Sequence, residues 1–202
     1  MITSLPNLLT LSRILVIPAL VGAFFLQAPL ANWVALTLFV AAGLTDWLDG
    51  HMARARNQVS GLGRFLDPVA DKLLVAAALM MLVFNGHIAG ISILPAVVIL
   101  CREILVSGLR EFLAEIKASL PVSKLAKWKT GVQMVAIGFV IVGDAGWHVI
   151  PVLEIGLVGL WLAALLTLYT GYDYLRAGLR HMVEPARETP PPAAVKQRTG
   201  TR

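Results

Sequence analysis

The chain has few charged residues, few aromatic residues and almost no cysteine. Charged side chains make up 14% of its 202 positions and aromatic ones 7%, whereas 57% of the residues are hydrophobic. Soluble domains carry roughly 25% charged residues, so this composition excludes an ordinary soluble domain and predicts a polytopic membrane protein. The single cysteine, Cys101, excludes an intramolecular disulfide. Because it lies in an apolar run, we expect a small buried hydrophobe rather than a reactive thiol.

The sequence also lacks the features of a secretory signal peptide and those of a nucleic-acid-binding protein. The first residues lack the basic segment and the small-residue cleavage site of a secretory signal peptide, so we expect the first apolar run to be retained. The net charge is +5, but the basic residues are not interleaved with aromatic ones on a polar surface, which argues against nucleic-acid binding. The positive charge therefore informs membrane topology.

Apolar segments long enough to cross a bilayer alternate with short polar loops. A membrane helix needs roughly 20 apolar residues, or fewer where protein shields it. We expect six spans, at residues 8–26, 33–48, 65–84, 91–113, 128–142 and 149–175. The predicted fold is therefore all-α, with six transmembrane helices around a cytoplasm-facing polar cavity. A single domain covers residues 1–183, and the Pro-rich polar tail, 184–202, is expected to be disordered.

Lys and Arg are distributed unequally between the two sets of loops. The loops 27–32, 85–90 and 143–148 contain neither residue, whereas the opposite loops and the tail contain many. The positive-inside rule then places both termini and the basic loops on the cytoplasmic side of the inner membrane. An even number of spans agrees with this assignment.

Four aspartates lie in and beside these apolar segments, between residues 46 and 71: Asp46, Asp49, Asp67 and Asp71. A carboxylate in or near a bilayer is costly, and its default interpretation is a functional site. Spacings of three and four place each pair on one helical face, and a short loop between antiparallel helices brings the two faces together. Four such groups repel one another unless cations neutralise them. Oxygen ligands without His or Cys favour Mg²⁺ or Mn²⁺ over zinc.

Small residues and one arginine accompany the aspartates. Gly50, Ala53 and Gly63 leave room for a bulky ligand near the backbone, and Arg54 is a fixed cation suited to a phosphate. A metal, an arginine and a cleft of small residues indicate phosphoryl chemistry on a diphosphate, with one carboxylate available to deprotonate the attacking hydroxyl. The alternative is that the aspartates cap helices or form ion pairs, which suits one aspartate better than four.

The run D-x2-D-G-x2-A-R-x8-G-x3-D-x3-D resembles the signature of the CDP-alcohol phosphatidyltransferases, and every position matches. This resemblance implies six helices around a cytoplasm-facing site, where a CDP-linked lipid gives its phosphatidyl group to a small alcohol. It also implies two divalent ions held by Asp46, Asp49, Asp67 and Asp71. We expect Asp71 to be the general base as well. The CDP portion would be received by Gly50, Ala53, Arg54 and Gly63.

A second group of polar residues indicates what kind of acceptor the protein uses. The fourth predicted span contains the stripe Arg102, Glu103, Ser107, Arg110 and Glu111, and the fifth is entered by Lys124, Lys127 and Lys129. Up to five cations lining one cavity favour a phosphorylated acceptor over a neutral polyol. The alternative is that the arginines form structural pairs with the glutamates and that the lysines only mark the cytoplasmic side.

These segments, with residues 5–13, resemble the bacterial members of the family that use glycerol 3-phosphate. The resemblance implies CDP-diacylglycerol as donor, with phosphatidylglycerol phosphate and CMP as products. It places the phosphate of glycerol 3-phosphate against Arg102, Arg110, Lys127 and Lys129. Asn7, Thr10 and Arg13 would lie near the nucleotide diphosphate, although Asn7 and Thr10 could equally be capping residues. The resemblance also implies a homodimer.

Two other functions are compatible with parts of the pattern. A sibling enzyme would use inositol phosphate, serine or phosphatidylglycerol as acceptor. A divalent-cation transporter would use the aspartates as a translocation site. Against the transporter, the aspartates lie near the cytoplasmic ends of their predicted helices, whereas transporter sites usually lie near the bilayer midplane.

Overall fold

The computed structural model describes residues 5–56, 61–115, 124–146 and 150–183. Within these ranges every regular element is helical. The α-helices are α1 (Leu5–Ala23), α2 (Leu30–Arg56), α3 (Gly61–Phe84), α4 (Ile93–Glu115), α5 (Lys124–Val142) and α6 (Val152–Val183), and two 3₁₀ turns are η1 (Gly90–Ser92) and η2 (Gly143–Ala145). The all-α prediction is therefore confirmed, and each predicted span corresponds to one of the six α-helices.

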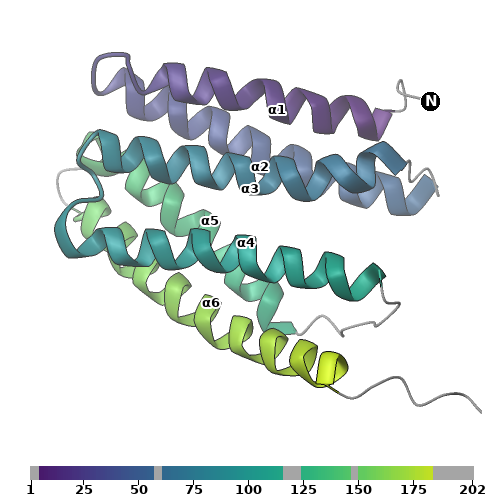
Figure 1. Cartoon of the computed structure of the whole chain (residues 1–202). Helices are drawn as coiled ribbons and strands as arrows, with labels where there is room; N and C mark the ends of the chain where they lie inside the picture. The colour runs from purple at the N-terminus through teal and green to yellow at the C-terminus, as the bar shows by residue number, and fades with distance from the viewer. Residues whose placement is uncertain (1–4, 57–60, 116–123, 147–149, 184–202) are drawn as a thin grey trace, which may run out of the picture.

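The helices run side by side, and consecutive helices point in opposite directions (Figure 1). Helix α1 packs against both α2 and α3, α6 packs against α4 and α5, and α2 joins the two groups through α5. The start of α1, the end of α2, the start of α3, the end of α4 and the start of α5 all lie toward the right of Figure 1. Residues 49–54 near the end of α2 and Lys127 and Lys129 near the start of α5 therefore lie toward this end of the bundle, whereas Asp71 and Arg102 lie near the middle of α3 and α4.

Four helices, α2, α3, α5 and α6, are longer than the apolar pattern predicted. Helix α2 continues to Arg56, eight residues past the predicted end at 48, and α6 continues to Val183. The added part of α2 contains most of the D-x2-D-G-x2-A-R segment, which is polar and was not counted as span. Its aspartates at i and i+3 thus lie on one helical face, as the spacing predicted.

Apolar side chains form the interior and also much of the surface. The core contains fully buried Leu20, Leu74, Ile137 and Leu160, whereas Met80 is 67% exposed. Exposed apolar side chains on this scale mark contact with lipid or protein. Two of the described helical segments, Gly90–Glu115 and Val152–Arg176, are long and apolar enough to cross a membrane. These features support membrane association.

Cys101 corrects one sequence-based expectation. It was expected to be buried among apolar neighbours, but it lies on an exposed face of α4. Helix α4 is apolar on its outer as well as its inner face near this residue, with Ile104 and Leu105 also exposed. The sequence of such a helix does not show which of its faces packs against the protein, because apolar residues are favoured both in the core and next to lipid.

The end of α5 is capped by side chains from distant parts of the chain. A helix leaves its last four carbonyl groups without partners inside the helix. Asn32 Nδ2 donates to the carbonyl oxygens of Ile141 (2.9 Å) and Val142 (3.1 Å), and His87 Nδ1 donates to the carbonyl oxygen of Val140 (3.0 Å). Three segments are thereby fixed together at the end of the bundle opposite the aspartates (Figure 1).

We expect Asn32→Ala to destabilise the protein by about 1–3 kcal/mol, because it leaves buried carbonyl groups without a donor. Thr37→Ala is the matched control on the same helix, since the exposed Thr37 hydroxyl donates only to Trp33 within α2. Thermal unfolding of both variants in detergent measures the difference. Equal midpoints for the two variants would contradict a capping role for Asn32.

Candidate active site

Two of the predicted metal-ligating carboxylates meet at one buried arginine. Arg13 of α1 is fully buried, and its Nη1 lies 2.7 Å from Oδ1 of Asp46 on α2. The same nitrogen lies 3.6 Å from Oδ1 of Asp71 on α3. The carboxylates are partly open to solvent, with side chains 39% exposed for Asp46 and 53% for Asp71. The faces of α2 and α3 therefore converge at this point, as the sequence spacing predicted.

Helix α1 is what brings these two carboxylates together. Contacts between α2 and α3 are sparse, whereas α1 packs extensively against both. A buried guanidinium requires anionic partners, and Arg13 obtains them from both neighbouring helices. Sequence reasoning placed Arg13 near the diphosphate but missed this bridging contact. The available signal was that Arg13 is the only charged residue of α1.

The donor chemistry at this point fits a hard divalent cation. Mg²⁺ is bound through oxygen ligands, typically one or two carboxylates with waters and substrate phosphates. Asp46 and Asp71 present carboxylate oxygens from different helices within 3.6 Å of a single nitrogen, so both can approach one small cation. Among the described side chains, no group of three or more His, Cys, Asp or Glu gathers in this way.

Several predicted site residues lie in described helices, but their side-chain surroundings lie outside the described part of the structure. These residues are Asn7, Asp49, Gly50, Ala53, Arg54, Gly63, Asp67 and Lys127. All of them except Lys127 belong to α1, α2 or α3, the helices that meet at Arg13. Thr10 is described and buried, one turn before Arg13.

A second polar cluster joins α4, α5 and α6. Glu103 on α4 accepts a hydrogen bond from Nζ of Lys129 on α5, and its Oε1 lies 3.7 Å from Nη1 of Arg102. Lys129 is only 3% exposed. Arg102 and Lys129, both predicted to bind phosphate, are thus brought together around one carboxylate.

The guanidinium of Arg102 is also held by α6. Its Nε donates to the carbonyl oxygen of Thr167 (3.1 Å) and its Nη2 to the hydroxyl of Thr170 (2.9 Å). The guanidinium carbon lies 5.9 Å from the centre of the Tyr174 ring. Gly171 permits this approach, because a Cβ there would lie 3.1 Å from Cγ of Arg102. These contacts match the structural-pair alternative for Arg102 and leave its phosphate-binding role a prediction.

Two cations near the second cluster have fewer partners. Arg110 is exposed on α4, about two turns beyond Glu103. Lys72 of α3 is half-buried, and its Nζ donates to the hydroxyl of Ser107 on α4. Sequence reasoning did not single out Lys72. Its position directly after Asp71 was the signal that could have identified it.

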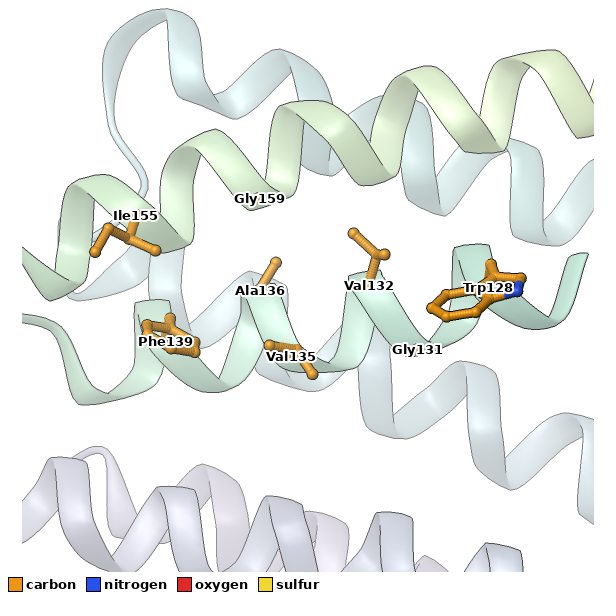
Figure 2. Close-up of a pocket in the computed structure, with 8 residues that line it drawn as sticks. All are labelled: Trp128, Gly131, Val132, Val135, Ala136, Phe139, Ile155 and Gly159. Atoms are coloured by element: carbon orange, nitrogen blue, oxygen red, sulfur yellow. The ribbon is translucent and has the colours of Figure 1, made fainter. Parts of the chain in front are cut away.

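An apolar groove with a volume of about 580 Å³ lies between α5 and α6. Figure 2 shows Val132 and Ala136 of α5 directed toward α6 at Gly159, with Trp128 at one end of the groove. The remaining lining residues are Gly131, Val135, Phe139 and Ile155. The lining contains no charged side chain, so this groove suits hydrocarbon and not a phosphate or a metal ion.

Comparison with known proteins defines the class of this protein. The sequence profile described as CDP-alcohol phosphatidyltransferase matches residues 3–169, a range that includes Arg13, Asp46 and Asp71 as well as Arg102, Glu103 and Lys129. The chain belongs to this family.

Individual relatives share one name, CDP-diacylglycerol–glycerol-3-phosphate 3-phosphatidyltransferase. The relative from Rickettsia bellii is 47% identical over 174 residues, which cover 86% of this chain and 94% of the relative. The relative from Haemophilus influenzae is 40% identical, covering 86% of this chain and 92% of its own. The relative from Cereibacter sphaeroides is 37% identical, covering 89% of this chain and 97% of its own.

Proposed function

We propose that this protein transfers the phosphatidyl group of CDP-diacylglycerol to sn-glycerol 3-phosphate, which gives phosphatidylglycerol phosphate and CMP. It would thus be a bacterial phosphatidylglycerophosphate synthase. The family membership and the shared name of its relatives support this activity. The structural observation that carries the proposal is the convergence of Asp46 and Asp71 on the Arg13 guanidinium.

In the proposed reaction, Asp46, Asp49, Asp67 and Asp71 hold two divalent ions, Mg²⁺ or Mn²⁺. When bound, such ions neutralise negative charge on the diphosphate and on the leaving CMP. Asp71 accepts the proton of the acceptor's 1-hydroxyl group, and the hydroxyl oxygen attacks the β-phosphorus in line. The bond between this phosphorus and the bridging oxygen breaks, and CMP leaves with the electron pair.

The remaining predicted residues would bind the two substrates. Gly50, Ala53, Arg54 and Gly63 would receive the CDP portion, with Asn7 and Thr10 near the diphosphate. All of these belong to the helices that meet at Arg13. The phosphate of glycerol 3-phosphate would bind on α4 and α5, at Arg102, Arg110, Lys127 and Lys129. Of these, Arg110 is exposed, whereas Arg102 and Lys129 contact Glu103.

We further propose six transmembrane spans in the inner membrane, with both termini and the active site facing the cytoplasm. The absence of Lys and Arg from loops 27–32, 85–90 and 143–148 supports this topology. A homodimer is proposed from the family resemblance alone, and cross-linking in native membranes tests it. The predicted tail, 184–202, lies outside the described residues.

A panel of acceptors tests the proposed activity. Purified protein is given CDP-diacylglycerol and Mg²⁺ with labelled glycerol 3-phosphate, inositol phosphate, serine or phosphatidylglycerol, and CMP release is measured. We expect turnover with glycerol 3-phosphate and a chelator to abolish it. Turnover with another acceptor alone would support a sibling enzyme. Uptake of divalent ions into proteoliposomes without CMP release would support a transporter.

We expect Arg110→Ala to raise the KM for glycerol 3-phosphate at least tenfold, because a hydrogen bond to a charged group contributes about 1.5–3 kcal/mol. The KM for CDP-diacylglycerol should change far less. Arg176→Ala, which removes an exposed arginine of α6, is the control and should leave both constants unchanged. Equal effects of Arg110→Ala on the two substrates would place the phosphate site elsewhere.

A further inference from the structure

We infer that Lys72, released from Ser107, is a direct ligand of the acceptor phosphate and sets the enzyme's preference for a phosphorylated acceptor. This inference rests on the proposed function and adds a residue of α3 to a phosphate site otherwise assigned to α4 and α5. It starts from the contact between the Lys72 ammonium group and the Ser107 hydroxyl.

The contact leaves the positive charge of Lys72 without a described counter-charge. A lysine ammonium group has three donors and a full charge, yet the described partner of Lys72 is a neutral hydroxyl. Lys129 differs, since its ammonium group contacts the carboxylate of Glu103. Exchanging Ser107 for a phosphate oxygen would give Lys72 a charge-assisted hydrogen bond, which is roughly twice as strong as a neutral one.

Lys72 faces the same stripe of α4 as the other cations. Glu103, Ser107 and Arg110 recur at i, i+4 and i+7 and so lie on one helical face. Lys129 from α5 reaches Glu103 on this stripe, and Lys72 from α3 reaches Ser107. Two helices, α3 and α5, therefore direct cations at one side of α4, which carries Arg110 itself.

The described charges around this stripe are unequal. The four cations are Lys72, Arg102, Arg110 and Lys129, whereas α4 carries three carboxylates, Glu103 and the exposed Glu111 and Glu115. An excess of positive charge inside a partly buried site favours an anionic ligand.

The cations also differ in what a phosphate would displace. Arg102 already donates to two acceptors on α6, and Lys129 is already held in a buried ion pair. Lys72 would leave only a hydroxyl, and it is half-buried whereas Lys129 is almost fully buried. Lys72 and the exposed Arg110 are therefore the cations most available to an incoming phosphate, while Arg102 and Lys129 hold α4, α5 and α6 together.

The position of Lys72 in the chain connects this site to the reaction centre. Successive residues of a helix point about 100° apart, so Asp71 faces α1 and α2 while Lys72 faces α4. A short acceptor with a hydroxyl near Asp71 and a phosphate near Lys72 would span the two. This geometry fits a small polyol monophosphate better than an amino acid or a large lipid.

The test compares Lys72→Met with the wild-type protein by steady-state kinetics. We expect the KM for glycerol 3-phosphate to rise at least twentyfold, the KM for CDP-diacylglycerol to change less than twofold, and Lys72→Arg to restore much of the loss. With glycerol, which lacks the phosphate, Lys72→Met and the wild type should have similar kcat/KM values. An equal rise in both KM values, or a fall in kcat alone, would overturn the assignment.

A binding measurement separates failure of this inference from failure of the proposed function. Glycerol 3-phosphate should raise the thermal midpoint of the wild-type protein by mass action and should not raise that of Lys72→Met. If glycerol 3-phosphate raises the midpoint of the wild-type protein only, but no CMP is released, the proposed reaction is wrong and the phosphate site at Lys72 stands. If Lys72→Met turns over with the wild-type KM for glycerol 3-phosphate and shows the wild-type shift of the midpoint, the phosphate site at Lys72 is wrong and the proposed reaction stands. Absence of any shift in the wild-type protein would also refute the site.

Ser107→Ala provides a second variant with the opposite expectation. It keeps the Lys72 ammonium group and removes the hydroxyl that competes with the phosphate. The KM for glycerol 3-phosphate should therefore stay at the wild-type value or fall. A tenfold rise in this KM would mean that the Lys72–Ser107 contact itself supports the site, against the proposed exchange.

Discussion

Asp71→Asn is expected to lower kcat for CMP release by about 10³-fold or more, while the protein remains folded. A positioned general base contributes about 10²–10⁴-fold to a reaction rate, and asparagine cannot accept the acceptor's proton. The fold should survive because Arg13 retains Asp46, whose Oδ1 lies 2.7 Å from Nη1. Single-turnover CMP release measures the rate, and thermal unfolding checks the fold.

Asp67→Asn is the comparison that separates the two proposed roles. If Asp71 acts mainly as the base, a Mn²⁺ titration of Asp71→Asn should give an affinity within a few-fold of the wild type. Asp67→Asn should weaken Mn²⁺ binding much more, since Asp67 is proposed to be a ligand only. A loss of affinity in Asp71→Asn as large as that in Asp67→Asn would contradict this division of roles.

Glu103→Gln is expected to have the largest effect on stability, about 3 kcal/mol. Removing one partner of a buried ion pair leaves an uncompensated charge, which costs about 3–5 kcal/mol for full burial. Lys129 is buried, with its side chain 4% exposed, whereas the Glu103 side chain is 22% exposed, so the lower part of this range applies. Arg102 also loses its neighbouring carboxylate. Thermal unfolding in detergent measures the loss.

Two further variants test the origin of this effect. Glu111→Gln removes an exposed carboxylate from the same helix and should change stability by less than about 0.5 kcal/mol. The double variant Glu103→Gln/Lys129→Met should recover part of the loss, because it removes both charges of the pair. Additive losses in the double variant would mean that Glu103 does not stabilise the protein through Lys129.

The sequence predicted the helices well because their apolar segments are long and clearly separated. The end of α2 was predicted too early, at residue 48, since the polar run up to Arg56 does not continue the apolar pattern. The helical spacing of the aspartates nevertheless predicted that the faces of α2 and α3 meet. Arg13 of α1 contacts both Asp46 and Asp71, so these two carboxylates lie close together through α1 and not through extensive contact of α2 with α3.

The contacts that the sequence did not reveal are tertiary ones. Arg102 was recognisable as a cation in an apolar helix, but its acceptors Thr167 and Thr170 lie on α6, far along the chain. The capping of α5 by Asn32 likewise joins residues that no local pattern connects. The exposure of Cys101 depends on which face of an apolar helix meets the core. Each of these required the packing of whole helices, not their individual periodicity.

The most direct test of the central claim is an anomalous difference map of crystals of this protein soaked with Mn²⁺. We predict a manganese peak between α2 and α3, within coordination distance, about 2.0–2.6 Å, of carboxylate oxygens from both Asp46 and Asp71. Such a peak would show that the two helices jointly hold the ion. A well-ordered site without manganese near these oxygens, with Arg13 still bridging them in the presence of CDP-diacylglycerol, would contradict the account.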